Sequence, residues 1–224
     1  MLNLNLIYKI MYKEYGLQGW WPINGKYPGK IKLNDKDIFE ISLGAILTQN
    51  TSWKNVDKAL GNLRENKMLQ INELRLIDIR KLALLIKSSG YNNQKAKKIK
   101  EFIKFLDSRI QINRENLLSV WGIGKETADS ILLYAYNKPY FVIDSYTKRV
   151  FSRLGFCKED IGYDELQQLF HDNLDHNFKL FNEYHALIVE HAKRFCRKKP
   201  ECIGCPLNTK CDYYKKNYEN LINE

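Results

Sequence analysis

Apolar residues recur with helical spacing along almost the whole chain, and this periodicity restricts the fold more than any other feature of the sequence. In residues 93 to 107, for example, one stripe is apolar: Ala96, Ile99, Phe102, Ile103 and Leu106. Runs of alternating apolar and polar residues, the pattern of half-buried strands, are few, and there are only five prolines. The sequence therefore predicts an all-α fold. The expected helices cover residues 36 to 48, 52 to 66, 70 to 76, 78 to 88, 93 to 107, 114 to 120, 125 to 136, 144 to 154, 163 to 174 and 179 to 195.

A turn with two glycines lies between two short predicted helices, in the segment GIGKETAD of residues 122 to 129. Gly122 and Gly124 allow positive φ and close approach of another backbone, and the amides that open the next helix suit a phosphate. The turn alone fits a plain helical hairpin equally well. Further along, Asp144 follows the apolar run FVI and begins another predicted helix, where an aspartate is an ordinary N-cap.

The chain carries 36 Lys and Arg against 26 Asp and Glu, a formal net charge of +10. This excess indicates a polyanionic partner such as nucleic acid. No apolar run approaches the roughly 20 residues of a membrane span, and the first residues read as an amphipathic helix and not as a signal peptide. We therefore expect a cytoplasmic protein without a membrane partner.

Four of the five cysteines lie within sixteen residues, in the pattern C-x5-C-x2-C-x5-C. Such spacing, in a protein expected to be cytoplasmic, points away from disulfides and towards a metal site. Ligation by thiolates alone suits either a [4Fe–4S] cluster or zinc. The predicted ligands are Cys196, Cys202, Cys205 and Cys211.

Taken together, these motifs resemble the helix-hairpin-helix DNA glycosylases of the endonuclease III superfamily. The similar segments are LGAILTQNTSW (43 to 53), SSGYNNQKAKKI (88 to 99), WGIGKETA with the later VIDSY, and HAKRFC before the cysteines. The resemblance implies that the hairpin binds a DNA phosphate through Gly122, Gly124, Lys125 and Thr127. It also implies that Asp144 faces the sugar of a nucleotide flipped out of the duplex and stabilises the transition state as the base leaves.

Glu126 departs from part of that family. Members that also cut the DNA backbone carry a lysine two residues after the second hairpin glycine, and its amine forms a Schiff base with the sugar. Glu126 stands at that position, and a carboxylate forms no imine. Lys125 lies one residue, about 100° of helix, away. The sequence thus predicts a monofunctional glycosylase that uses water and lacks lyase activity.

Aromatic residues near the N-terminus bear on the substrate. Trp20, Trp21, Phe39 and the LTQNT segment resemble the 3-methyladenine branch of the superfamily, in which the corresponding aromatics form the base pocket. Such a cage attracts cationic 3-methyladenine or 7-methylguanine by forces of roughly 0.5 to 2 kcal/mol. Gln49, with Asn50 beside it, resembles the position that fills the gap left by the flipped base, and Tyr91 the position that wedges into the opposite strand.

The resemblance further implies a [4Fe–4S] cluster in preference to zinc, although the family pattern C-x6-C-x2-C-x5-C is one residue longer than the pattern here. We expect a monomer that acts on double-stranded DNA containing a damaged base. Its helical barrel would cover residues 34 to 142, and residues 1 to 33 with 143 to 224 would form a second helical domain with the cluster loop 196 to 211. Two alternatives remain: a glycosylase for oxidised or mismatched pyrimidines, and a DNA-binding cluster protein without catalysis.

Overall fold

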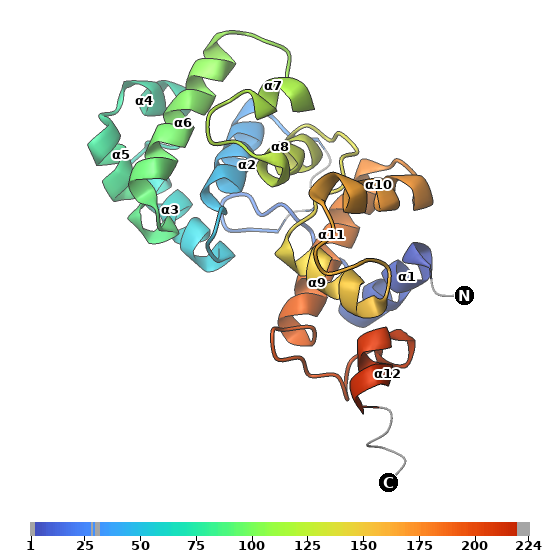
Figure 1. Ribbon diagram of the computed structural model, residues 1–224. Coiled ribbons are helices and arrows are strands. Elements are labelled where there is room, and N and C mark those ends of the chain that lie inside the picture. The colour runs from blue at the N-terminus through green and yellow to red at the C-terminus, as the bar shows by residue number, and fades with distance from the viewer. Residues whose placement is uncertain (1–2, 28, 30–31, 219–224) are drawn as a thin grey trace. The chain divides into compact units, whose positions relative to one another are not determined.

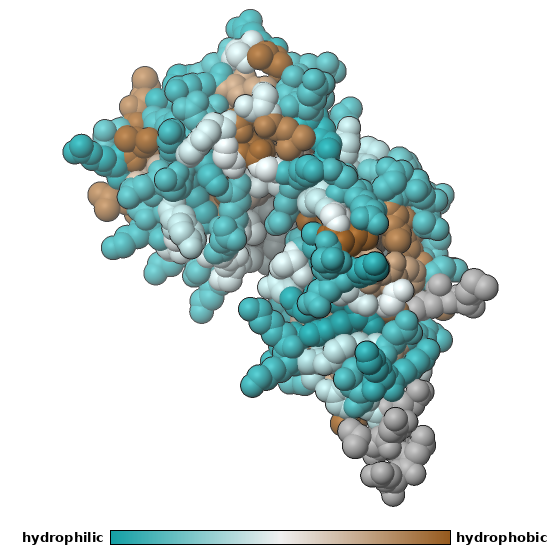
Figure 2. Space-filling view, in the orientation of Figure 1, coloured by the Kyte–Doolittle hydropathy of each residue, from teal (hydrophilic) through white to brown (hydrophobic). Residues whose placement is uncertain are grey.

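The computed structural model describes residues 3–27, 29 and 32–218, and it confirms the all-α prediction. Across these described residues, twelve α-helices form and the only β-pairing is an isolated bridge between Ile23 and Lys26. Within the same part of the chain, no helix is long and apolar enough to cross a membrane. The surface seen in Figure 2 is mainly hydrophilic, with small separate apolar patches.

The chain divides into two compact units. We call Trp21–Tyr140 the hairpin unit, and Met1–Trp20 with Phe141–Glu224 the terminal unit. The contact pattern thus groups the described residues from Trp21 to Leu33 with the hairpin unit, whereas the sequence prediction placed residues 1 to 33 with the C-terminal part. Trp21 gives the physical reason, because its indole lies against α2 (Asp35–Leu47), where a Cβ on Gly44 would stand 3.0 Å from the ring.

Helix α2 is the central element of the hairpin unit (Figure 1). Ten of its residues are buried, as expected for a helix surrounded by other helices. It begins with a capping box in which the side chains of Asn34 and Asp37 each accept a hydrogen bond from the other's backbone N–H. Its neighbours include α3 (Trp53–Glu65), α6 (Asn92–Asp107) and α8 (Lys125–Ser130).

Shorter helices complete this unit: α4 (Ile71–Leu76), α5 (Ile79–Leu85), the 3₁₀ turn Lys87–Ser89 and α7 (Arg114–Leu118). After α8 the chain continues as a π-helical segment, Ile131–Ala135, instead of the regular helix expected to residue 136. The backbone N–H of Tyr136 donates to the carbonyl of Ile131 at 3.3 Å, the five-residue spacing that defines a π turn.

The terminal unit contains α1 (Leu4–Tyr15), α9 (Ser145–Leu154), α10 (Tyr163–Asn173), α11 (Phe178–Arg194), the 3₁₀ turn Asn208–Lys210 and α12 (Asp212–Tyr218). Helix α11 packs against both α1 and α9. The core of the terminal unit is aromatic. The rings of Phe141 and Phe170 stack with their centres 3.8 Å apart, and the buried Tyr184 donates a hydrogen bond of 2.8 Å to the carbonyl of Leu4. This bond fixes the N-terminal helix to the C-terminal half of the chain.

Candidate active site

The predicted hairpin forms between α7 and α8. Gly122 has φ +85°, a conformation that favours glycine, and a Cβ there would meet the Lys98 side chain at 2.5 Å. Ile123 is buried and anchors the turn in the unit. Gly124 is the N-cap of α8, and a Cβ on it would meet nothing within 4 Å. The two glycines therefore have different roles: Gly122 is required by packing and conformation, whereas Gly124 leaves the start of α8 open.

Gln49 is hydrogen-bonded to this hairpin. Its Nε2 donates to the Gly122 carbonyl at 3.1 Å and to Thr127 Oγ1 at 2.8 Å, and its Oε1 accepts from Lys98 Nζ. Thr127 is buried, so its hydroxyl serves this internal network. The structure thus brings together three residues that the sequence assigned to DNA contact: Gln49, Gly122 and Thr127. Gln49 would have to break these bonds to fill a gap in the duplex.

Exposed side chains surround this network. Asn50 and Tyr91 share a cavity wall with Gln49 and Gly122, and Tyr91 is 71% exposed. Trp121, on the hairpin itself, lines the same cavity and is 47% exposed, with Lys97 Nζ 4.2 Å from its ring centre. Trp121 was not predicted from the sequence, although its position beside the first hairpin glycine is a local signal.

Glu126 and Lys125 occupy the first turn of α8, and both are exposed. The carbonyl of Glu126 accepts a hydrogen bond from Ser130 Oγ at 2.7 Å. The structure therefore presents a carboxylate to solvent at the position where lyase members of the family carry a lysine.

Asp144, in the terminal unit, is the N-cap of α9. Its Oδ1 accepts hydrogen bonds from the backbone N–H of Thr147 at 2.7 Å and from Thr147 Oγ1 at 2.8 Å. Its Oδ2 lies 3.6 Å from Nε2 of His185 on α11. Burial raises the pKa of this carboxyl, but His185 and the two Thr147 donors outweigh burial and hold it below its usual value. The group is thus fixed in orientation and ionised near neutral pH.

His185 itself was not found from the sequence. It lies 41 residues after Asp144, and no local motif joins the two. Only the packing of α11 against α9 brings them together.

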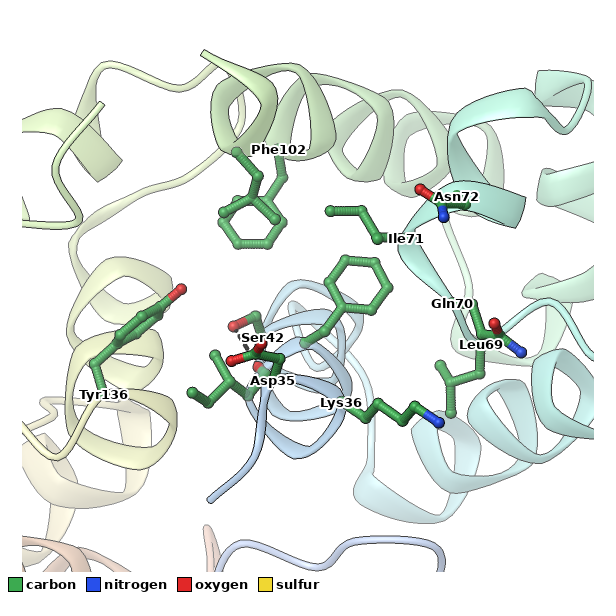
Figure 3. A pocket seen from close by; sticks show the side chains of 12 residues that line it. Asp35, Lys36, Ser42, Leu69, Gln70, Ile71, Asn72, Phe102 and Tyr136 are labelled. Atoms are coloured by element: carbon green, nitrogen blue, oxygen red, sulfur yellow. Dashed lines mark hydrogen bonds between the residues drawn. The ribbon is translucent and has the colours of Figure 1, made fainter. Parts of the chain in front are cut away.

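The predicted pocket aromatics have separate surroundings. Trp21 contacts Trp53 and Tyr134, with ring centres 5.2 and 5.0 Å away. Phe39 instead lines a mainly apolar cavity with Phe102 of α6 and Tyr136; in Figure 3, Tyr136 lies on one side of this cavity and Leu69 on the opposite side. Trp20 is the last N-terminal residue of the terminal unit, whereas Trp21 begins the hairpin unit, and Trp20 is half-buried.

All four predicted ligand cysteines line one small cavity of the terminal unit, together with apolar residues such as Val150 and Leu207. Arg153 donates to Cys196 Sγ at 3.4 Å, and Arg149 donates to the Cys196 carbonyl at 2.7 Å. In the portion of the chain that is described, no three His, Cys, Asp or Glu side chains are grouped so as to hold a metal ion. The cysteines thus share an enclosure, and the donor set is of the thiolate type that suits a [4Fe–4S] cluster.

These features define a class of protein: the chain belongs to the HhH-GPD superfamily of base excision DNA repair proteins, whose family model matches residues 43–176. It is a DNA glycosylase of the endonuclease III type.

Particular relatives agree with this assignment. The chain is 45% identical over 218 residues to the putative DNA repair glycosylase MJ1434 of Methanocaldococcus jannaschii, with 92% of this chain and 94% of that protein covered. It is 31% identical to endonuclease III of Sulfolobus acidocaldarius, covering 96% and 98% of the two chains.

Two solved structures are similar as well. The H. pylori 3-methyladenine DNA glycosylase MagIII, bound to 1,N6-ethenoadenine, gives a TM-score of 0.71 at 32% identity, over 86% of this chain and 98% of that one. A non-covalent endonuclease III–DNA complex gives a TM-score of 0.81 at 22% identity, over 98% and 100%, a likeness of fold.

Proposed function

We propose that this protein is a monofunctional DNA glycosylase that removes alkylated purines, with Asp144 as the catalytic carboxylate. The observation that carries the proposal is the state of that carboxylate, which is fixed by Thr147 and ionised beside His185. An ionised, oriented carboxylate stabilises positive charge that develops on a sugar ring. The cap bonds from Thr147 also lower the pKa of this carboxyl, but an N-cap role alone would not require a histidine partner.

The chemistry balances with water as the only co-substrate. The bond between C1′ and the base nitrogen breaks, and its electron pair leaves with the base, so a cationic alkylpurine departs neutral. The carboxylate of Asp144 stabilises the oxocarbenium-like sugar. A water oxygen then bonds to C1′ and gives its proton to the carboxylate, which releases it to solvent.

We infer that no lyase step follows. Glu126 occupies the position of the Schiff-base lysine, and its side-chain carboxylate has no amine to attack the sugar. The product would be an intact abasic site, which breaks only after treatment with alkali or heat.

An alkylated purine is the substrate class that the relatives and the aromatic residues favour. The likeness to the H. pylori 3-methyladenine glycosylase reaches 32% identity, and its bound ligand is a modified adenine. We propose Trp21, edge-on to Trp53, close to Tyr134 and buried in this structure, as the aromatic residue that stacks on the flat cation. The 31% identity to an endonuclease III supports the competing reading, a glycosylase for oxidised pyrimidines.

We propose that the DNA contacts come from the exposed side chains around the hairpin. Tyr91 would wedge into the duplex, and Asn50, the exposed neighbour of the hairpin-bound Gln49, would lie at the gap left by the flipped nucleotide. The hairpin turn of Gly122 and Gly124 would bind a backbone phosphate.

We propose that Cys196, Cys202, Cys205 and Cys211 hold a [4Fe–4S] cluster. The shared cavity and the N–H donation of Arg153 to Cys196 Sγ support this choice. When bound, the cluster would cross-link the loop of residues 196 to 211. Arg153 also donates to the carbonyls of Arg197 and Lys198, at 2.6 and 3.1 Å, and so orders a basic segment suited to a phosphate.

A panel of duplexes with single defined lesions tests the substrate. We expect excision from the 3-methyladenine and 7-methylguanine duplexes, and none from duplexes with thymine glycol or a G·T mismatch. Strand breaks should appear only after alkali, and borohydride should trap no protein–DNA adduct. The opposite lesion preference would contradict the alkylpurine assignment, and a trapped adduct would contradict the monofunctional one. Binding without excision of any lesion would favour the non-catalytic alternative.

A further inference from the structure

Lys95 is the one described lysine of α6 whose side chain is enclosed by the protein. It is 1% exposed, while Lys97 and Lys104 on the same helix lie at the surface. Its Nζ donates hydrogen bonds to the carbonyl of Leu47 at 2.8 Å and to the carbonyl of Ser89 at 2.6 Å. Neither the excision chemistry nor the hairpin uses this group.

The two carbonyls belong to the segments that lead into the exposed turns. Leu47 is the last residue of α2, three residues before Asn50, and Ser89 ends the 3₁₀ turn two residues before Tyr91. Asn50 and Tyr91 both have left-handed backbone conformations, with φ +54° and +45°. Non-glycine residues adopt this conformation at a cost, and it persists where the surroundings enforce it.

The hydrogen bonds of Lys95 hold the backbone on both sides of these left-handed residues in place. Its backbone N–H donates to the carbonyl of Tyr91 at 3.0 Å, while its ammonium holds the ends of the two segments. Burial, with a smaller contribution from the charge of Lys98, lowers the pKa of Lys95 to about 8. The ammonium therefore stays mainly protonated at pH 7, and its bonds to the carbonyls are charge-assisted.

We infer that Lys95 is a positioning residue for DNA distortion: its ammonium ties the Asn50 turn to the Tyr91 turn, so that both engage the duplex together when a nucleotide is extruded. The inference rests on the DNA contacts proposed above for these two turns. It predicts that loss of the ammonium separates DNA binding from DNA distortion. Phosphate contacts would persist, and the coordinated insertion of the two turns would not.

A fluorescent duplex tests this without reference to the excised lesion. The probe carries a tetrahydrofuran abasic analogue opposite 2-aminopurine, whose fluorescence rises when it unstacks. Saturating wild-type protein should raise the signal. Lys95→Met should bind, as measured by anisotropy, but populate the unstacked state about tenfold less, because two buried carbonyls lose their charged donor. Lys104→Met, the same change at an exposed position of the same helix, controls for the lost charge and should match the wild type.

The outcomes separate the inference from its premise. Wild-type binding without any rise would overturn the role proposed for the two turns, and the inference with it. If wild-type protein raises the 2-aminopurine fluorescence and Lys95→Met raises it equally, the role inferred for Lys95 is wrong, while the role proposed for the two turns stands. Lys95→Arg keeps a cation with N–H donors and should recover most of the rise; a folded arginine variant as defective as methionine would contradict the hydrogen-bond argument. If circular dichroism shows Lys95→Met unfolded, Lys95→Gln replaces it under the same criterion.

Discussion

Replacing Asp144 with asparagine separates catalysis from helix capping. The side-chain oxygen of asparagine can accept the same two hydrogen bonds from Thr147 that Asp144 Oδ1 accepts at 2.7 and 2.8 Å. Asparagine and aspartate cap helices about equally well, so the free energy of unfolding should fall only by the charge-dependent part, which comes from the interactions that hold the pKa of Asp144 below its ordinary value. The negative charge is lost, and excision should be roughly 10² to 10⁴ times slower.

Asp144→Ala is the matched control, because it removes both the charge and the cap. It should lose about 0.5 to 2 kcal/mol of stability and be as slow as the asparagine variant. Urea unfolding and single-turnover excision at saturating protein measure the two quantities. Asparagine and wild-type rates that agree would refute the catalytic assignment. If the excision rates of the two variants fall only in proportion to their lost stability, Asp144 acts only as an N-cap.

The pH dependence of stability provides an independent check. The pKa of Asp144 is held below its ordinary value in the folded protein. A group of this kind stabilises the fold fully above its unfolded pKa, near 4, and the contribution is lost as pH falls through the folded pKa. The stability difference between wild type and Asp144→Asn should therefore be constant at neutral pH and change only below about pH 4.

Three further results are expected. His185→Gln should raise the pKa of the catalytic aspartate, so the acid limb of the excision profile should move to higher pH while rates near pH 8 change less; an unmoved limb would contradict the pairing. Gly122→Ala should weaken DNA binding by about tenfold or more, since it adds backbone strain and a steric overlap with the Lys98 side chain. Gly124→Ala should lose much less affinity, and equal losses of affinity in a DNA titration would contradict the different roles assigned to the two glycines. Protein purified without oxygen should be brown with about four irons per chain by metal analysis, lost in Cys205→Ser but kept in Cys157→Ser; one stoichiometric zinc would overturn the cluster.

Helix positions were largely predictable from the sequence because the apolar stripes and caps are local signals. The expected helix over residues 93 to 107, for instance, is observed as Asn92–Asp107. Helix α12 was not predicted, because its sequence DYYKKNY carries no apolar stripe over a full pair of turns. The π-helical segment also escaped prediction, since an apolar run such as ILLYA fits either kind of helix.

The parts of the site that depend on packing were less accessible. The glycine turn and Asp144 have local signatures, but His185 reaches Asp144 only through the contact between α9 and α11. The environment of Lys95 is equally non-local, because its hydrogen-bond acceptor in α2 lies 48 residues earlier in the chain. Periodicity predicts which face of a helix is buried, and it does not predict that a charged side chain will find acceptors there.

The π-helical segment Ile131–Ala135 has a consequence for how this chain compares with its relatives. A π turn holds one residue more than the same length of α-helix. Because the π turn absorbs this extra residue, removing one residue here would restore regular winding and leave the residues on either side on the same helix faces. All five residues of the segment are buried, so the extra residue is accommodated without turning a side chain of this run to solvent. A relative with a regular α-helix at this place would align with a one-residue gap. The number of residues between its hairpin and its catalytic aspartate would then be one smaller than in this chain.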